Sequence, residues 1–286
     1  MTTQQLGSVP VPTPTPGPAP TRSRYASGAA IAMIIGVLGT ILLVRIAVFS
    51  ESGQLIDAEA TEVLHARQEA LEPLLSALGT ISTGTVAVAL AACVVLALIR
   101  RRFAAAGAAV LIVGGANVTT QLIKATVDRP DFGNGFGSHN SLPSGHTTVT
   151  VSIVLAALLV APVGLRALTV ALGAFAIVFI GMSTVVAGWH QTSDVLAALT
   201  VTLAWSGLAV LLLSLRPTER PRGGIGAFFL AAFGAVAAVI ALVVTGVRPY
   251  DGWHGVEPAL TVLAVIMGGT ALTIAWFARL SSAHAR

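Results

Sequence analysis

The chain has 286 residues, of which 55% are hydrophobic and 10% are charged, and its formal net charge at pH 7 is +4. Soluble domains are about 45–50% apolar and about 25% charged, so this composition excludes an ordinary soluble domain and indicates an integral membrane protein. The lone Cys93 excludes a disulfide framework and a thiolate metal site. We expect no metal, no cofactor and no nucleic acid partner.

Residues 1–25 are predicted to form a disordered cytoplasmic tail, because they are rich in proline and threonine and hold almost no large apolar side chain to bury. Arg22 and Arg24 then precede an apolar stretch from Ala29 to Phe49. This stretch is longer than the core of a cleavable signal, which has about 7–15 residues. It is therefore predicted to be an uncleaved first membrane span.

Apolar runs along the chain predict an all-α, polytopic membrane helical bundle. A helix needs about 20 apolar residues to cross the hydrocarbon core of a bilayer. About eight runs reach or approach that length, namely residues 28–49, 83–99, 104–123, 147–163, 166–188, 192–214, 225–246 and 258–279. The first six form a predicted membrane core over residues 26–215, and the last two form an additional C-terminal hairpin within residues 216–286.

The distribution of positive charge predicts the orientation of the bundle. If the N-terminus is cytoplasmic, the inner segments hold most of the 16 Lys and Arg residues, as the positive-inside rule requires. These inner residues are Arg22, Arg24, Arg100, Arg101, Arg102, Arg166, Arg216, Arg220, Arg222, Arg279 and Arg286. Both termini are then cytoplasmic, and residues 124–146, 183–194 and 248–257 open on the outer face of the cell membrane.

The segment from Gln54 to Leu78 is too acidic to be a span. Its acidic residues are Asp57, Glu59, Glu62, Glu69 and Glu72. Leucines at helical spacing predict an amphipathic helix, which either lies on the outer membrane surface or packs on neighbouring spans. In the hairpin loop, Tyr250, Trp253 and His254 are predicted to be interface anchors.

His190 and Asp194 lie four residues apart near the predicted start of a helix. Residues at this spacing share one helix face, so the carboxylate can reach the imidazole and fix its tautomer. The other ring nitrogen is then available as a nucleophile. The same pair also suits a structural role, since the helix dipole favours Asp in a first turn.

The sequence Pro143-Ser144-Gly145-His146 runs directly into an apolar helix. Ser144 can cap this helix, and the first backbone N–H groups have no intrahelical partner, so the helix start attracts phosphate. His146 beside such an anion site could protonate a leaving oxygen. In isolation, the pattern also fits a simple transition from loop to helix.

Lys124 ends the third predicted span, and Arg129 follows it in a short loop. Either residue alone suits interfacial snorkelling or solvation. The lysine, the helix start and the His-Asp pair nevertheless arrive by separate helices at one predicted membrane face. This co-location indicates phosphoryl transfer.

The ordered set of Lys124 with Arg129-Pro130, Pro143 to His146, and Ser183 with His190 and Asp194 resembles the signature of the type 2 phosphatidic acid phosphatase family. That signature is Lys-x6-Arg-Pro, Pro-Ser-Gly-His and Ser-Arg-x5-His-x3-Asp, and the resemblance covers roughly residues 55–214. It implies a metal-independent membrane phosphatase with a six-helix core, acting on a lipid phosphate or polyprenyl diphosphate.

The resemblance also implies a role for each matched residue. His190 would attack phosphorus to form a phosphohistidine, Asp194 would orient it, and His146 would protonate the leaving oxygen. The expected ligands of the phosphoryl oxygens are Lys124, Ser144 and Gly145, with Arg129 as a partial replacement for a motif arginine.

Two motif arginines are replaced, by Asp131 and Thr184. Loss of one preorganised donor to a developing oxyanion costs about 10²–10³ in rate, so weakened activity is expected if nothing compensates. Two alternatives therefore remain open. One is an impaired family member that binds lipid headgroups or a partner, and the other is a phosphotransferase that passes the phosphoryl group to a second acceptor.

Overall fold

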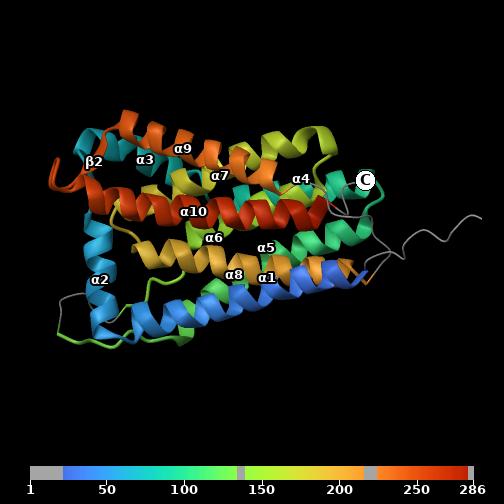
Figure 1. Ribbon diagram of the computed structural model, residues 1–286, viewed down its shortest axis with the longest axis horizontal. Helices are drawn as coiled ribbons and strands as arrows, with labels where there is room; N and C mark the ends of the chain where they lie inside the picture. The colour runs from blue at the N-terminus through green and yellow to red at the C-terminus, as the bar shows by residue number, and fades with distance from the viewer. Residues whose placement is uncertain (1–21, 134–138, 216–223, 283–286) are drawn as a thin grey trace, which may run out of the picture.

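The computed structural model describes residues 22–133, 139–215 and 224–282 (Figure 1). The predicted tail lies outside the described residues up to position 21. The same is true of Arg216, Arg220, Arg222 and Arg286, which belong to the inner segments of the predicted orientation. The predictions made for these residues stay predictions.

The described chain folds into a bundle of α-helices with one π-helical turn. The elements are α1 (Arg22–Leu43), the π-helical η1 (Val44–Val48), α2 (Glu51–Glu62), α3 (Gln68–Gly79), α4 (Thr83–Ile99), α5 (Phe103–Thr126), α6 (Gly145–Val160), α7 (Val163–Val186), α8 (Thr192–Leu213), α9 (Ile225–Thr245) and α10 (Val256–Ser281). The long helices run side by side along the long axis of the molecule, whereas α2 stands across one end (Figure 1). The predicted all-α polytopic membrane bundle is confirmed.

Six described segments are long and apolar enough to cross a membrane, namely Ala26–Val48, Phe103–Thr126, Val163–Val186, Thr192–Leu213, Ile225–Thr245 and Val256–Ser281. The other two predicted spans differ from these. α4 meets the same requirement only together with α3, from which it is bent by 53°. α6 has 16 residues and is shorter than a full span. The eight predicted spans thus correspond to six full-length helices, one bent pair and one short helix.

Three arginines hold the last turn of α6. Arg100, Arg102 and Arg166 donate to the carbonyl oxygens of residues 158–160 at distances of 2.7–3.2 Å. The last carbonyls of a helix have no intrahelical partner, and positive charge is favourable at this negative end of the helix dipole. The C-terminal end of α6 is therefore fixed, at the opposite end of the helix from Ser144.

The acidic segment does not form one helix, so the prediction of a single amphipathic helix over Gln54–Leu78 is wrong. A short strand, β1 (Leu64–Ala66), separates α2 from α3 and pairs antiparallel with β2 (Val247–Pro249), which follows α9. Backbone groups that a continuous helix would bond internally are bonded to β2 instead. α2 packs on the bundle, which was the second of the two expected arrangements, and it buries Gln54 and Asp57 there.

α1 and α8 approach each other closely through glycine. A Cβ added at Gly207 would lie 2.5 Å from the backbone nitrogen of Met33, and one added at Gly36 would lie 2.4 Å from that of Ala204. The two helices therefore touch main chain to main chain. Small residues allow this close packing between membrane helices.

Gly207→Ala is expected to destabilise the protein by about 1–3 kcal/mol, because the added methyl group forces the two backbones apart. The matched control is Gly114→Ala inside α5, where an added Cβ meets no described atom within 4 Å. This control is expected to be neutral or slightly stabilising, since Ala favours helix over Gly. Thermal unfolding in detergent compares the two variants, and equal transition temperatures would contradict the close contact.

Candidate active site

The turn between α7 and α8 carries the predicted nucleophile. Gly188 adopts a positive φ of 71°, which lets the chain reverse directly after α7. The backbone N–H groups of Trp189 and His190 then both donate to the carbonyl oxygen of Thr184, at 3.0 and 3.2 Å. These bonds hold the backbone of His190 at the end of α7, one residue before the N-cap of α8.

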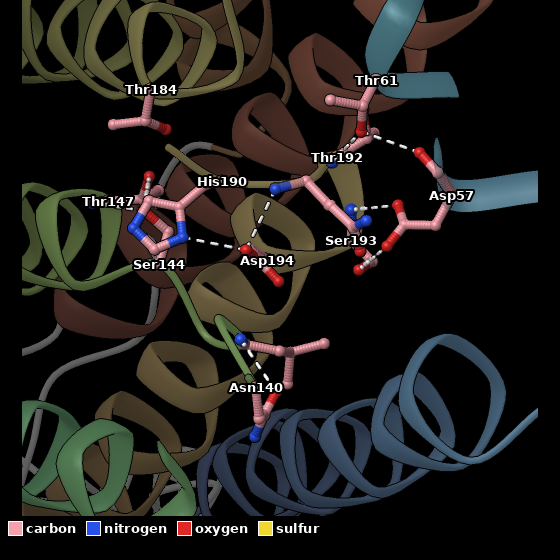
Figure 2. A network of polar contacts seen from close by, with 12 residues as sticks. Asp57, Thr61, Asn140, Ser144, Thr147, Thr184, His190, Thr192, Ser193 and Asp194 are labelled. Carbon is pink, nitrogen blue, oxygen red and sulfur yellow. Dashed lines mark hydrogen bonds and ion pairs between the residues drawn. The ribbon is translucent and has the colours of Figure 1, made fainter. Parts of the chain in front are cut away.

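Asp194 binds the imidazole of His190, as the spacing predicts. The Nδ1 atom of His190 lies 2.8 Å from the Oδ2 atom of Asp194, and the same oxygen accepts from the backbone N–H of Gln191 at 3.0 Å (Figure 2). Asp194 is almost fully buried, whereas the side chain of His190 keeps 9% of its surface exposed. The contact on Nδ1 leaves Nε2 as the ring nitrogen that can meet a substrate.

The start of α6 lies directly beside this pair. The backbone N–H of Ser144 donates to the carbonyl oxygen of Asp194 at 2.9 Å, which joins the second and third motifs. The buried Ser144 hydroxyl caps α6 by accepting from the backbone N–H and the hydroxyl of Thr147. Beside Gly145, an added Cβ would meet no described atom within 4 Å. Open space therefore adjoins a helix start whose first N–H groups have no intrahelical acceptor.

Lys124 and His146 complete the cluster. Lys124 is partly buried at the end of α5, and its positive charge interacts with Asp194. His146 lies in the first turn of α6, where its charge interacts with those of His190 and Lys124. Its ring also contacts Trp189, with a centroid separation of 5.5 Å. The structure thus brings together six predicted site residues from α5, the start of α6 and the turn that leads into α8, namely Lys124, Ser144, Gly145, His146, His190 and Asp194.

Arg129 is buried against the same turn. Its guanidinium donates to the side-chain oxygen of Gln191 at 3.1 Å, next to His190 in the chain, and its charge also acts on Asp57. The carbonyl oxygen of Pro130 accepts from the side chain of Gln54 at 3.1 Å. The loop after α5 is therefore bonded both to α2 and to the turn that carries His190.

The two replaced motif positions have different surroundings. Asp131 is exposed, and its carboxylate accepts from the backbone N–H of Gly133 within its own loop, at 2.8 Å. Thr184 is fully buried, and its hydroxyl donates to the carbonyl oxygen of Gly181 at 2.7 Å. Thr184 therefore supports the His190 turn through its backbone and supplies no cation.

Asp131→Asn is expected to change kcat/KM by less than about threefold, because an exposed charge acts through water of high dielectric and is screened by salt. The measurement is phosphate release at low and moderate ionic strength, with Asp128→Asn as a neighbouring exposed control. An increase of tenfold or more for Asp131→Asn alone would mean that this carboxylate repels the substrate.

Sequence reasoning missed the contact between α2 and the start of α8. The Asp57 carboxylate accepts from the backbone N–H of Ser193 at 2.9 Å and also from the Ser193 hydroxyl (Figure 2). The hydroxyl of Thr61 accepts from the backbone N–H of Thr192 at 3.1 Å. The sequence offers no signal for these bonds, since Asp57 is one of five acidic residues in its segment and its partner is 136 positions away.

Burial raises the pKa of Asp57 from its ordinary value of 3.8 to about 6, although the hydrogen bonds from Ser193 act in the opposite direction. The charge of Asp194 raises this pKa further and that of Arg129 lowers it. The folded state therefore binds the proton of Asp57 more tightly than the unfolded chain does.

This difference predicts a pH dependence of stability. The contribution of Asp57 to the free energy of unfolding is complete below the unfolded pKa of 3.8 and is lost as the pH rises through about 6. Asp57→Asn cannot ionise and is expected to lack this slope. The melting temperature of the wild type minus that of Asp57→Asn should therefore fall between pH 4 and pH 7, and a constant difference would contradict the raised pKa.

The fold is that of a polytopic membrane protein, and the cluster joins two histidines, a carboxylate and a lysine. Residues 105–218 match the family model of the PAP2 superfamily, and this match supports a PAP2-type phosphatase family assignment. The match includes Lys124, Arg129, the start of α6 and the His190–Asp194 pair, and it leaves α1 to α4 and the hairpin of α9 and α10 outside. Neither a curated protein nor a solved structure matches the chain significantly. The resemblance drawn from the three motifs is confirmed.

Proposed function

We propose that this protein is a membrane phosphatase that hydrolyses a lipid phosphate or a polyprenyl diphosphate through a phosphohistidine formed on His190. The observation that carries the proposal is the 2.8 Å contact between His190 and the buried carboxylate of Asp194, within the matched segment and beside the start of α6. A held imidazole next to an anion-attracting helix start suits nucleophilic attack on a phosphoryl group.

The reaction proceeds in two steps. In the first, the Nε2 lone pair of His190 forms a bond to phosphorus, the bond from phosphorus to the leaving oxygen breaks, and His146 gives that oxygen a proton. In the second, a water oxygen attacks phosphorus, His146 takes the proton from this water, and the bond between phosphorus and Nε2 breaks. Inorganic phosphate leaves and both histidines return to their starting states.

The phosphoryl oxygens are bound by residues from three elements. Lys124 supplies a positive charge from α5, and the first N–H groups of α6, including that of Gly145, supply hydrogen bonds. The Ser144 hydroxyl accepts two bonds from Thr147, so its own proton remains for a phosphoryl oxygen. Arg129, which contacts the neighbouring Gln191, adds a further positive charge.

A lipid substrate at the outer face of the cell membrane is supported by the apolar bundle and by the distribution of basic residues. The helix starts and turns that carry the site all lie at one end of the helices, beside α2 (Figures 1 and 2). The positive-inside rule predicts that this end is outside. A lipid diffusing in the outer leaflet then brings its phosphate to the site by lateral movement.

The proposal is tested with purified protein in detergent micelles containing phosphatidic acid or a polyprenyl diphosphate, with para-nitrophenyl phosphate as a non-lipid comparison. We expect phosphate release from at least one lipid and slower release from the non-lipid ester. Reaction mixtures quenched in alkali, where phosphohistidine survives, are expected to carry phosphate on the peptide that contains His190. Release of phosphate with the adduct on another residue would overturn the mechanism, and no release would overturn the activity.

A second candidate function is favoured by the surroundings of Thr184. Its buried hydroxyl is bonded to Gly181, so the position that holds a motif arginine in the family provides no positive charge here. On this reading the protein binds lipid headgroups without turnover. It predicts saturable binding to vesicles that contain phosphatidic acid, no phosphate release, and gain of activity in Asp131→Arg combined with Thr184→Arg.

A further inference from the structure

α2 presents a polar face to the site and an apolar face outward. Gln54 and Asp57 are buried, whereas Leu55 and Ile56 are 42% and 65% exposed. Gln54, Asp57 and Thr61 follow one another at intervals of three and four residues, so they lie on one face of the helix. Burial of this polar face requires hydrogen-bonding partners, because an unpaired buried polar group is costly.

Apart from Val48 of η1, the partners of this face belong to the loop after α5 and to the first turn of α8. Gln54 donates to the carbonyl oxygens of Val48 and Pro130, at 2.9 and 3.1 Å, and so binds the loop of Arg129. Asp57 accepts both donors of Ser193 in the first turn of α8. Figure 2 shows Asp57 reaching this turn from the side opposite His190, with Asp194 between them.

Asp57 contacts Ser193, which is adjacent in the chain to Asp194, the partner of His190. Ser193 precedes Asp194, whose carboxylate binds His190 and whose carbonyl oxygen accepts from Ser144. A shift of the first turn of α8 would therefore move the carboxylate that orients His190. α2 is itself fixed at its far end, because β1 follows it and pairs with β2 of the C-terminal hairpin.

We propose that Asp57 is a positioning residue, whose carboxylate fixes the first turn of α8 through Ser193 and thereby holds Asp194 and His190 in the geometry required for attack on phosphorus. This inference rests on the proposed phosphatase function. It also gives the C-terminal hairpin a role, since the hairpin holds the end of α2 through β2. The two hydrogen bonds from Ser193 favour the carboxylate form of Asp57 and partly offset the cost of its burial.

The test compares the wild type with Asp57→Asn, Asp57→Ala, Ser193→Ala and the double variant Asp57→Asn with Ser193→Ala. Misplacement of reacting groups by about 1 Å costs about 10²-fold in rate, so we expect a fall in kcat of about tenfold for Asp57→Asn and about 10²-fold for Asp57→Ala. KM is expected to stay within about twofold, because three of the four proposed phosphate ligands, Lys124, Ser144 and Gly145, lie on α5 and at the start of α6. Glu59→Gln, an exposed acidic residue on the same helix, is the matched control and should leave both constants unchanged.

A merely structural role gives a different result. In that case the variants melt at lower temperature, while kcat for the folded protein stays equal to that of the wild type, and this outcome overturns the inference. Coupling is a second criterion, because two residues that act through one contact give losses that do not add. The double variant is therefore expected to lose no more kcat than Asp57→Asn alone, and additive losses would overturn the route through Ser193.

Hydrogen exchange separates failure of this inference from failure of the proposed function. The backbone N–H of Ser193 donates to Asp57, so exchange in a peptide covering residues 190–196 is expected to be faster in Asp57→Asn than in the wild type or in Glu59→Gln. This readout does not require activity. If the wild type releases no phosphate, the function fails, and faster exchange still supports the positioning contact whereas unchanged exchange overturns it.

Discussion

His190→Ala is expected to lower the rate of phosphate release by about 10⁴–10⁶-fold, with a loss of stability of about 1–3 kcal/mol. Removal of a nucleophile eliminates the covalent route, and what remains is the contribution of binding and of preorganised donors. The imidazole is mostly buried, and its removal leaves the buried Asp194 carboxylate without this 2.8 Å contact, so some stability is lost as well. The measurement is steady-state phosphate release, together with trapping of the phosphorylated enzyme.

The matched control for this variant is His254→Ala. His254 is an exposed histidine in the loop of the C-terminal hairpin, so its replacement changes the same side chain away from the site. Its rate and melting temperature are expected to equal those of the wild type. Equal rates for wild type and His190→Ala, or an adduct that still forms in His190→Ala, would contradict the assignment of the nucleophile.

Asp194→Asn is expected to lower kcat by about 10³–10⁴-fold, the loss that follows when a carboxylate partner of a catalytic histidine is replaced by an amide. The carboxylate accepts a hydrogen bond from Nδ1–H of His190, which keeps the ring proton on Nδ1 and leaves Nε2 unprotonated. An amide nitrogen facing Nδ1 would donate instead, which moves the ring proton to Nε2 and removes the lone pair that attacks phosphorus. The substrate still binds, so KM is expected to change far less than kcat.

Trapping of the phosphorylated enzyme measures how fast Nε2 of His190 attacks phosphorus, and this rate depends on which ring nitrogen carries the proton. Asp194→Asn should form the His190 adduct slowly in a single turnover, whereas the exposed Asp251→Asn should form it at the rate of the wild type. The loss should persist from pH 6 to pH 8, because an amide does not titrate. Recovery of the wild-type rate anywhere in this range would contradict the role of Asp194 in fixing the proton.

The helices and the chemistry-bearing pairs can be predicted from the sequence because their signals are local. Apolar runs mark the spans because a chain that crosses lipid must form a helix, in which its backbone groups hydrogen-bond to one another. The four-residue spacing of His190 and Asp194 places both side chains on one helix face, which is enough to predict their contact. The helix start at Gly145 is likewise indicated by its own residues, with Ser144 as the cap.

The rest depends on contacts between segments distant in sequence. β1 pairs with β2 across roughly 180 residues, and neither three-residue strand has a pattern of its own. In the sequence, Asp57 is one of several acidic residues in its segment. Only the structure distinguishes it from the exposed Glu59, by its burial and its contact with Ser193. The orientations of the Asp131 and Thr184 side chains also follow from hydrogen bonds to nearby backbone groups, which a comparison of motifs does not show.

The short length of α6 has a consequence for the depth of the site. Its 16 residues rise about 24 Å, against a hydrocarbon core of about 30 Å, and its C-terminal end is fixed by three arginines. In the predicted orientation, the start of α6 then lies below the level that a full span would reach. On the proposed function, a lipid headgroup phosphate has to sink, or the surrounding leaflet has to thin, before the phosphate meets His190. On the same proposal, the thickness of the surrounding bilayer sets the distance between the phosphate plane and His190, so hydrophobic mismatch becomes part of substrate access.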